Sequence, residues 1–399
     1  MIDTAHSLLA DNIRLRTPGV AAIVHLNAAS AALPSAGVIA AMTAHLDREG
    51  RVGLQAAAAG AADALATTRA HAARVLGCRS DQIAFGHGCA QLWALVLQAR
   101  RPPRGARILV SRGEWGGNLL ALQPLAQAHD LRIEIIPTDP AGRIDVARLK
   151  ARLDDDVWLI AVAAVSSASG LRQPVAAIGA LPRPDGCLYM VDAAQAAGRF
   201  PVSLAEMGAD VLVAPTRKWL RGPRGQALAA LSDAALARLA PPAPDLGGVT
   251  WQAGGDAVLR PDARRFEIYD CGVAARLGLG AALDELLAAG PAAVAEIIDQ
   301  RLGELRAALT ACDGVTIHEP VDADAAFLTF DCGRPPATVA AALAERGIAV
   351  AAIERIYAPH ELDARGRTAV LRAAPHAYTH PDEIGRFVEA LKAFLADRR

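Results

Sequence analysis

Lysine is scarce in this sequence of 399 residues. Of its 41 basic side chains other than histidine, only three are lysine: Lys150, Lys218 and Lys392. Arginine keeps its proton in proteins, whereas a lysine amine can lose it and attack a carbonyl to form a Schiff base. Lys218 differs from the other two because it follows an apolar strand pattern and precedes Trp219. We therefore single out Lys218 as a candidate catalytic residue; alternatively, it caps the strand or pairs with a carboxylate.

An excess of charge of either sign is also absent. The sequence has 42 acidic and 41 basic residues, which gives a net charge of −1, and 53% of its residues are hydrophobic. A balanced surface gives no reason to expect nucleic acid or an acidic membrane as a partner. The length fits one large globular domain with a smaller one.

Targeting and cross-linking signals are missing as well. The N-terminal residues have no basic stretch followed by an apolar run, so no signal peptide is predicted, and no apolar run reaches membrane-spanning length. The six cysteines show no C-x-x-C spacing, which argues against a zinc site or a disulfide framework. We expect a cytoplasmic protein with free thiols.

Short apolar runs alternate with helical patterns in the central part of the chain. This alternation predicts an α/β fold with a mostly parallel, seven-stranded sheet and helices on both faces. Ligands of such sheets bind beyond the carboxyl ends of the strands. The predicted strands are Gln82–Phe85, Arg107–Ser111, Arg132–Pro137, Val157–Val165, Cys187–Val191, Val211–Ala214 and Gln226–Ala230.

The flanking segments predict helices and a second, smaller α+β domain. Gly53–Gly60 is either a loop or a helix extension, and Ala240–Arg265 is predicted to be a loop. We divide the chain into an N-terminal segment (1–30) that packs on the small domain, a large domain (31–265), and an interdomain helix with the small domain (266–399). The other predicted elements are helices Ser35–Arg48, Ala62–Leu76, Val273–Leu309 (interrupted near Gly290), Pro336–Arg346 and Pro381–Ala396, and strands Ala326–Asp331, Ile348–Ala352 and Ala369–Ala373.

Polar groups follow several of the predicted strands. Asp192 could hold a pyridine nitrogen protonated, or cap a helix beginning at Ala193. The small-residue turn Gly86–Ala90 offers backbone N–H groups to a phosphate. Trp115, flanked by glycines, could stack on a flat ring.

Taken together, these residues resemble the class V aminotransferase family of pyridoxal-phosphate enzymes, which includes cysteine desulfurases and isopenicillin N epimerase. The resemblance spans nearly the whole chain and implies the fold of PLP-dependent transferases of type I. It rests on an ordered set of segments: Asn27–Pro34 (N-A-A-S-A-A-L-P), Gly86–Ala90, Val165–Gly170 (V-S-S-A-S-G), Asp192–Gln195 (D-A-A-Q), Thr216–Gly225 (T-R-K-W-L-R-G-P-R-G) and Leu371–His376 (L-R-A-A-P-H).

The resemblance implies pyridoxal 5′-phosphate as cofactor and assigns a role to each matching residue. Lys218 would bind it covalently, Asp192 would pair with its ring nitrogen and Gln195 with its ring oxygen. Arg372, with Asn27 or Ser30, would hold the substrate carboxylate; alternatively, Arg372 forms a salt bridge between domains. The remaining cofactor contacts would be Gly88, Cys89, Ala90, Trp115, Ser167, Thr216 and Arg217.

The chain also departs from the family pattern. Trp115 and Ser167 stand where desulfurases have a histidine and an asparagine, and Asp270 stands where the family has a threonine that contacts the neighbouring subunit's phosphate. The segment 347–357 contains no cysteine, although a desulfurase needs a persulfide-forming thiol there. This absence argues against desulfurase activity.

The reaction is less closely defined than the cofactor. Segments 114–118, 216–225 and 264–283 look most similar to the lyases that cleave hercynylcysteine sulfoxide in ergothioneine biosynthesis, which favours β-elimination at a C–S bond. An epimerase of the isopenicillin N type is the alternative, with His87, Tyr357 or His376 as its second acid. A catalytically silent binding module is a further alternative. An NAD enzyme is disfavoured because Gln91 stands in place of a third glycine.

Family members form homodimers, so we expect a homodimer with active sites at the interface.

Overall fold

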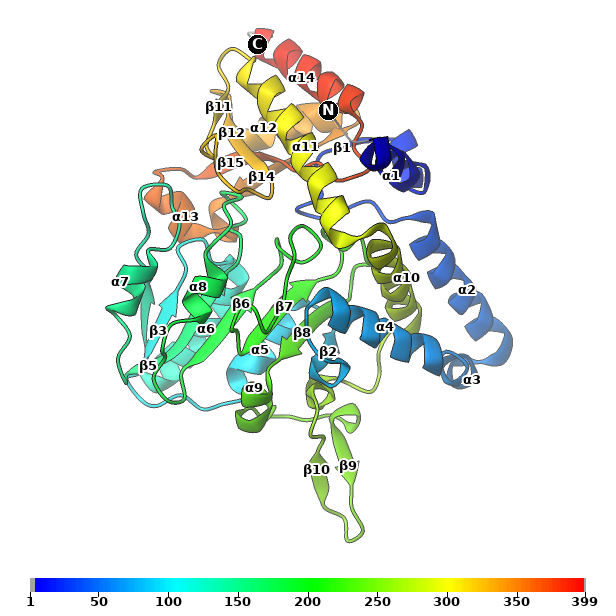
Figure 1. Cartoon of the computed structure of the whole chain (residues 1–399), viewed down its shortest axis with the longest axis vertical. Helices are drawn as coiled ribbons and strands as arrows, with labels where there is room; N and C mark the ends of the chain where they lie inside the picture. Colours follow the sequence, from blue (N-terminus) through cyan, green and yellow to red (C-terminus); the bar gives the residue numbers. More distant parts are fainter. Residues whose placement is uncertain (1–3, 398–399) are drawn as a thin grey trace.

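Two sheets of unequal size organise the molecule. The computed structural model describes residues 4–397. Figure 1 shows the larger sheet at the centre of the molecule and the smaller one near the C-terminal helix.

The large sheet confirms the predicted seven strands. Their order is β2-β8-β7-β6-β5-β3-β4; β8 is antiparallel to both of its neighbours, and the other pairs are parallel. The strands are β2 (Ile83–Gly86), β3 (Arg107–Val110), β4 (Arg132–Ile135), β5 (Val157–Ala163), β6 (Leu188–Asp192), β7 (Val211–Pro215) and β8 (Ala227–Leu231).

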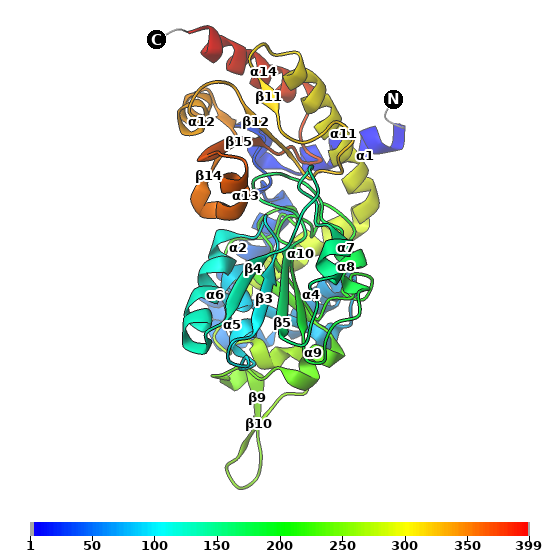
Figure 2. The same ribbon diagram turned by 90° about the vertical axis from the view of Figure 1, so that its left-hand side faces the viewer.

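The central strands are buried on both faces. Ile160 and Val162 of β5 belong to one hydrophobic core, and Leu159 and Ala161 belong to a second core on the opposite face. This division follows from the two-residue period of a strand, and it explains why these strands are continuous apolar runs. Figure 2 shows α5 and α6 on one face of the sheet and α7 and α8 on the other.

The helices of the first 310 residues follow the predicted pattern closely. Gly53 has a φ of 82° and ends the second helix, so the segment Gly53–Gly60 contains a separate short helix, Leu54–Ala59, and is neither a loop nor an extension. The predicted break at Gly290 is confirmed. The helices are α1 (Thr4–Leu15), α2 (Ala36–Val52), α3 (Leu54–Ala59), α4 (Ala62–Val75), α5 (Cys89–Gln98), α6 (Gly116–His129), α7 (Val146–Lys150), α8 (Val175–Gly179), α9 (Asp233–Arg238), α10 (Val273–Ala289) and α11 (Pro291–Thr310), with 3₁₀ turns η1 (Pro18–Ala21), η2 (Ser80–Gln82), η3 (Leu246–Gly248) and η4 (Ala263–Phe266).

The C-terminal part forms a four-stranded antiparallel sheet covered by helices. The predicted strand Ile348–Ala352 is divided in two, because β13 pairs with the distant β1 whereas β14 pairs with β15. The elements are β1 (Val24–His25), β11 (Thr316–Ile317), β12 (Leu328–Asp331), α12 (Pro336–Ala344), β13 (Ile348–Ala349), β14 (Ala351–Glu354), η5 (Arg355–Tyr357), α13 (Pro359–Ala364), β15 (Ala369–Ala373) and α14 (Pro381–Ala396).

The segment predicted to be a loop contains a β-hairpin. Strands β9 (Val249–Trp251) and β10 (Ala257–Leu259) are joined through Gly254 and Gly255, whose φ angles are 110° and 95°. The hairpin projects from the end of the molecule opposite the small sheet (Figure 1), and Trp251 on it is 62% exposed.

The N-terminal segment contacts the C-terminal part of the chain. β1 pairs with β13, and Arg14 forms two hydrogen bonds with the carboxylate of Glu383 on α14. The domain boundaries at residues 30 and 265 stay a prediction.

Among residues 4–397, no helix combines the length and apolar character needed to cross a bilayer.

Candidate active site

A cavity of about 390 Å³ lies at the carboxyl ends of the parallel strands. It brings together most of the residues that the sequence predicts for the site. Thr216, Asn27, Ser30 and Arg372 are not among the residues that line it. The predicted residues that do line it are Gly88, Cys89, Ala90, Trp115, Ser167, Asp192, Gln195, Arg217 and Lys218, together with His87, a candidate second acid of the epimerase alternative.

Lys218 is only 8% exposed and follows β7 after a short turn. Burial lowers the pKa of its amine to about 8, and the attraction of Asp192 opposes this shift. The charges of Arg372 and Arg217 lower the pKa further. The amine lies 5.8 Å from the centroid of the Trp115 ring. Because its pKa is close to neutral, this lysine can act as a base or a nucleophile.

Asp192 ends β6 and faces the cavity. Its Oδ1 accepts the Ala194 N–H at 2.8 Å, and its Oδ2 accepts an Asn118 amide hydrogen at 2.8 Å. Burial raises the pKa of this carboxyl, and the nearby Lys218 lowers it. The segment after Asp192 is a turn, so the alternative that it caps a helix at Ala193 is wrong.

Gln195 connects the cavity to the loop after β1. Its Nε2 donates to the Ala29 carbonyl at 2.9 Å, and its Oε1 accepts the Trp219 indole N–H at 2.9 Å. These two bonds fix the orientation of the amide within the cavity wall.

One end of the cavity is suited to an anion. Gly88 caps α5, whose first-turn N–H groups carry partial positive charge. Arg217 and Arg224 line this end, and burial followed by repulsion from Arg224 lowers the pKa of Arg217. Arg217 Nε and Gln226 Oε1 are buried and have no hydrogen-bond partner among the described residues. Sequence reasoning missed Arg224 and Gln226.

Thr216 differs from the expectation that its hydroxyl binds phosphate. The residue is fully buried, and its Oγ1 lies within hydrogen-bonding distance of the carbonyls of Pro223 (2.8 Å) and Gln226 (3.0 Å). The hydroxyl therefore stabilises the turn after Lys218 from behind the cavity.

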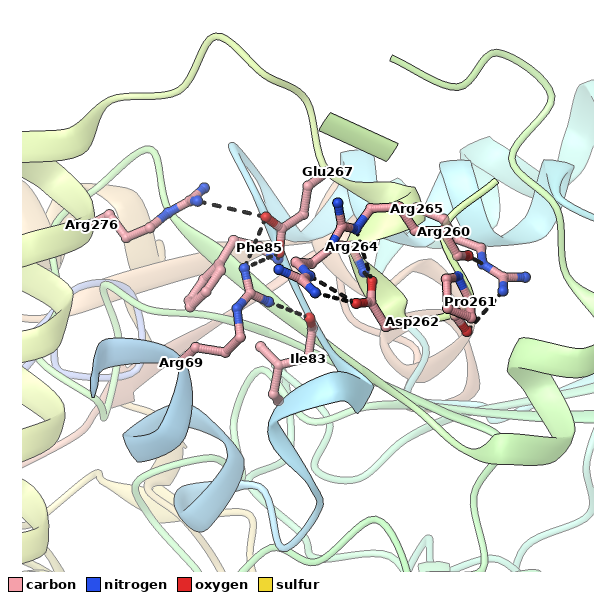
Figure 3. A network of polar contacts seen from close by, with 10 residues as sticks. All are labelled: Arg69, Ile83, Phe85, Arg260, Pro261, Asp262, Arg264, Arg265, Glu267 and Arg276. Atoms are coloured by element: carbon pink, nitrogen blue, oxygen red, sulfur yellow. Dashed lines mark hydrogen bonds and ion pairs between the residues drawn. The ribbon is translucent and has the colours of Figure 1, made fainter. Parts of the chain in front are cut away.

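A charged network holds β2, the strand that leads into the Gly86–Ala90 turn (Figure 3). Glu267 accepts the Phe85 backbone N–H at 3.0 Å and pairs with Arg69 at 2.8 Å and Arg276 at 3.7 Å. The guanidinium carbons of both arginines lie within 5 Å of the Phe85 ring centroid, at 4.7 and 4.5 Å. The network joins β2 to α4 and α10 and so fixes the start of the turn.

Trp115 stacks on Tyr357 of η5. Their ring centroids are 5.3 Å apart, and the interplanar angle is 18°. The contact depends on Gly116, since a Cβ at this position would lie 1.9 Å from the Ile356 carbonyl oxygen. Trp115, which lines the cavity, is therefore backed by a residue from the C-terminal part of the chain.

Arg372 and its neighbours form a separate cluster beside the cavity. Arg372 is 3% exposed, and burial lowers its pKa to about 9. It donates to the Ser167 carbonyl at 3.1 Å and to the Ser30 hydroxyl at 2.6 Å, and no ion pair found within residues 4–397 includes it. The predicted alternative of an interdomain salt bridge is therefore wrong. Asn27 Oδ1 and Arg372 Nε are buried and unpartnered in the described part of the chain.

The sequence matches known proteins along nearly its whole length. A sequence model of the family described as Aminotransferase class-V matches residues 23–387. A Mycobacterium tuberculosis (strain CDC 1551 / Oshkosh) protein named "Probable hercynylcysteine sulfoxide lyase" is 33% identical over 399 residues, which cover 97% of this chain and 94% of that protein.

Solved structures share the fold. The cysteine desulfurase CsdA from Escherichia coli superposes with a TM-score of 0.88 at 22% identity, covering 97% of this chain and 98% of that one. The cystine C–S lyase C-DES, in complex with its product cysteine persulfide, gives 0.85 at 21% identity, covering 96% and 99%. Another C-DES structure carries glycine covalently linked to its PLP cofactor. The predicted fold of PLP-dependent transferases of type I is confirmed. The chain belongs to the class V aminotransferase family.

Proposed function

We propose that this chain is a pyridoxal-phosphate-dependent carbon–sulfur β-lyase that acts, as a cytoplasmic homodimer, on a cysteine S-conjugate or its sulfoxide. Hercynylcysteine sulfoxide is the specific substrate that we favour. Support comes from the name of the 33% identical relative and from the family match. The products would be a sulfur-bearing acid, pyruvate and ammonia.

The donor set of the cavity fits pyridoxal 5′-phosphate. Arg217, whose Nε has no hydrogen-bond partner among residues 4–397, suits the phosphate dianion together with Arg224 and the first turn of α5. Asp192 suits a protonated ring nitrogen, Lys218 suits the aldehyde, and the flat face of Trp115 suits the ring.

The remaining residues account for the chemistry. When bound, the cofactor supplies an electron sink for the negative charge left at the substrate Cα. We assign removal of the Cα proton to Lys218, because its pKa of about 8 leaves part of the amine neutral near pH 7. Arg372 orients the α-carboxylate in the bidentate geometry of a guanidinium. Cleavage of the Cβ–S bond then releases a three-carbon fragment that hydrolyses to pyruvate and ammonia.

The observation that carries the proposal is the buried amine of Lys218, whose pKa responds to both Asp192 and Arg372. A base in this position serves elimination without a second group on the opposite face. An epimerase needs that second acid, yet His376 lies outside the cavity with its ring nitrogens bonded to Trp219 and Ala377. Tyr357, another candidate, is stacked on Trp115. The third candidate, His87, does line the cavity, but it lies next to Gly88 at the end that we assign to the phosphate.

The experiment offers the purified enzyme hercynylcysteine sulfoxide and simple cysteine S-conjugates, and measures pyruvate and ammonia. Elimination predicts both products in equal amounts. Exchange of the Cα hydrogen for solvent deuterium, without pyruvate from any sulfur substrate, would overturn the lyase assignment in favour of epimerisation. A protein that takes up no pyridoxal phosphate would favour the silent binding module.

A further inference from the structure

Two buried carboxylates, those of Asp192 and Glu114, share one amide in the wall of the cavity. The Asn118 Nδ2 group donates one hydrogen to Asp192 Oδ2 and the other to Glu114 Oε1, each at 2.8 Å. Glu114 Oε2 accepts the Ser111 hydroxyl at 3.1 Å, and Oε1 also accepts the Trp115 N–H at 3.3 Å. A chain of hydrogen bonds therefore runs from Ser111, which follows β3, through Asn118 on α6 to Asp192 at the tip of β6.

Glu114 is completely buried, and no ion pair found within residues 4–397 includes it. Burial, followed by the repulsion of Asp192, raises its pKa to about 7, while the bonds from Asn118, Ser111 and Trp115 lower it. The titratable groups that face it are Asp192 on β6 and, through a weaker coulombic effect, the Cys89 thiol on α5. A buried carboxyl without a cation is costly to keep charged, and here three hydrogen bonds offset part of that cost.

We propose that Glu114 is a positioning residue that acts on Asp192 through Asn118: it fixes the orientation of the Asp192 carboxylate, and its negative charge strengthens the hold of Asp192 on the proton of the cofactor's ring nitrogen. This inference rests on the proposed function, since it takes the ring nitrogen as the partner of Asp192. The physical reason is that the repulsion between two close carboxylates makes each a stronger base.

The geometry distinguishes this role from a purely structural one. A carboxylate that only anchored α6 would need no hydrogen-bond partner in common with Asp192, because Ser111 and the Trp115 N–H already tie it to the end of β3 and the start of the helix. The same Asn118 amide nitrogen bonds both carboxylates, so a change of charge at Glu114 reaches Asp192 through one side chain.

The test compares two cofactors on the full-length apoprotein. One is pyridoxal phosphate, and the other is its 1-deaza analogue, which has a carbon in place of the ring nitrogen. The ratio of their dissociation constants measures the contribution of the ring nitrogen, since phosphate, aldehyde and ring stacking are common to both. Glu114→Gln should reduce the preference for pyridoxal phosphate by about tenfold, which corresponds to a decrease of roughly one pKa unit in the basicity of the Asp192 carboxylate. An equal increase in the dissociation constants of both cofactors would overturn the inference.

Glu319→Gln is the matched control. Glu319 is also a buried carboxyl with its pKa raised to about 7 by burial, but it bonds Thr329 in the small sheet, away from the cavity. We expect the cofactor ratio of this variant to equal that of the wild type. A change as large as that of Glu114→Gln would mean that the ratio reports general stability, and would also overturn the inference.

The wild-type protein provides a test that does not depend on a variant that folds. As Glu114 ionises, the preference for pyridoxal phosphate should increase between about pH 6 and about pH 7.5, and a flat ratio would contradict the inference. The titration of Lys218 affects both cofactors alike and cancels in the ratio. If the chain binds neither cofactor, the proposed function itself is wrong; if it binds both with no effect of Glu114, only the inference is.

Discussion

The guanidinium of Arg372 lies 2.6 Å from the hydroxyl of Ser30, a residue 342 positions earlier in the chain. This bond joins β15 to the loop after β1 beside the cavity. Arg372 is a buried cation, and no carboxylate pairs with it within the described range 4–397. An incoming substrate carboxylate would complete the cluster.

Replacing Arg372 with Ala should therefore mainly weaken substrate binding. We expect KM to rise by about 100-fold, corresponding to a few kcal/mol, because a bidentate partner for the α-carboxylate is lost. Steady-state kinetics with a cysteine S-conjugate would measure this, with the visible spectrum of the bound cofactor as control. An unchanged KM would remove Arg372 from the substrate site.

Lys218→Arg should abolish activity even though it preserves the positive charge. An arginine cannot lose its proton, so it can neither attack the aldehyde nor remove the Cα proton. The wild-type protein should be yellow, and borohydride should fix the cofactor to Lys218, as detected by peptide mass. Labelling at Lys150 or Lys392 instead would contradict the assignment.

Gly116→Ala should displace the segment that carries Tyr357, because the added Cβ would collide with the Ile356 carbonyl. We expect a loss of about 1–3 kcal/mol in the free energy of unfolding, from overpacking, and lower activity. Gly385→Ala on α14 is the control, since its Cβ would meet no atom within 4 Å, and it should be neutral or slightly stabilising. Equal behaviour of the two variants in thermal unfolding would refute the steric argument.

Acid should destabilise the protein below pH 6.5, partly through His376. Burial lowers the pKa of this imidazole from 6.5 to about 3. Between pH 6.5 and about pH 3, the unfolded chain therefore binds a proton at this residue and the folded chain does not. The free energy of unfolding should then fall by up to about 1.4 kcal/mol per pH unit from this group. Urea unfolding of wild type and His376→Asn should converge as the pH falls from 6.5; parallel curves would contradict the assignment.

Sedimentation should give twice the 41.4 kDa mass of one chain. Trp251 on the hairpin and Tyr269 are 62% and 63% exposed, which favours contact with another surface. Trp251→Glu should shift the equilibrium toward monomer, whereas Val321→Glu, at a site 80% exposed outside the hairpin, should not. An active wild-type monomer at assay concentration would refute the homodimer.

Much of the fold could be predicted because its signals are local. Each central strand is a short apolar run that ends in a turn, and the scarcity of lysine together with the apolar strand before Lys218 singled out that residue. The division between β13 and β14 could not be predicted in this way, since it depends on pairing with β1, more than 300 residues away. The β9–β10 hairpin was missed because its proline- and glycine-rich surroundings favour a loop.

The candidate site was predicted less completely. A glutamate in sequence is expected at the surface, so nothing marks Glu114 as buried; only the fold brings Ser111, Asn118 and Asp192 around it. The direction of the Thr216 hydroxyl was likewise invisible, because the turn that it stabilises closes ten residues later at Gln226.

The contacts of the N-terminal segment have a consequence for synthesis. Arg14 bonds Glu383, β1 pairs with β13, and Ser30 receives its hydrogen bond from Arg372. The N-terminus leaves the ribosome first, so Arg14, β1 and Ser30 are synthesised long before the residues that they contact. The large sheet can form while translation continues, but the Arg372 cluster beside the cavity is completed only after nearly the whole chain has left the exit tunnel. If Arg372 binds the substrate carboxylate as proposed, the enzyme can reach its full affinity for substrate only after translation has ended.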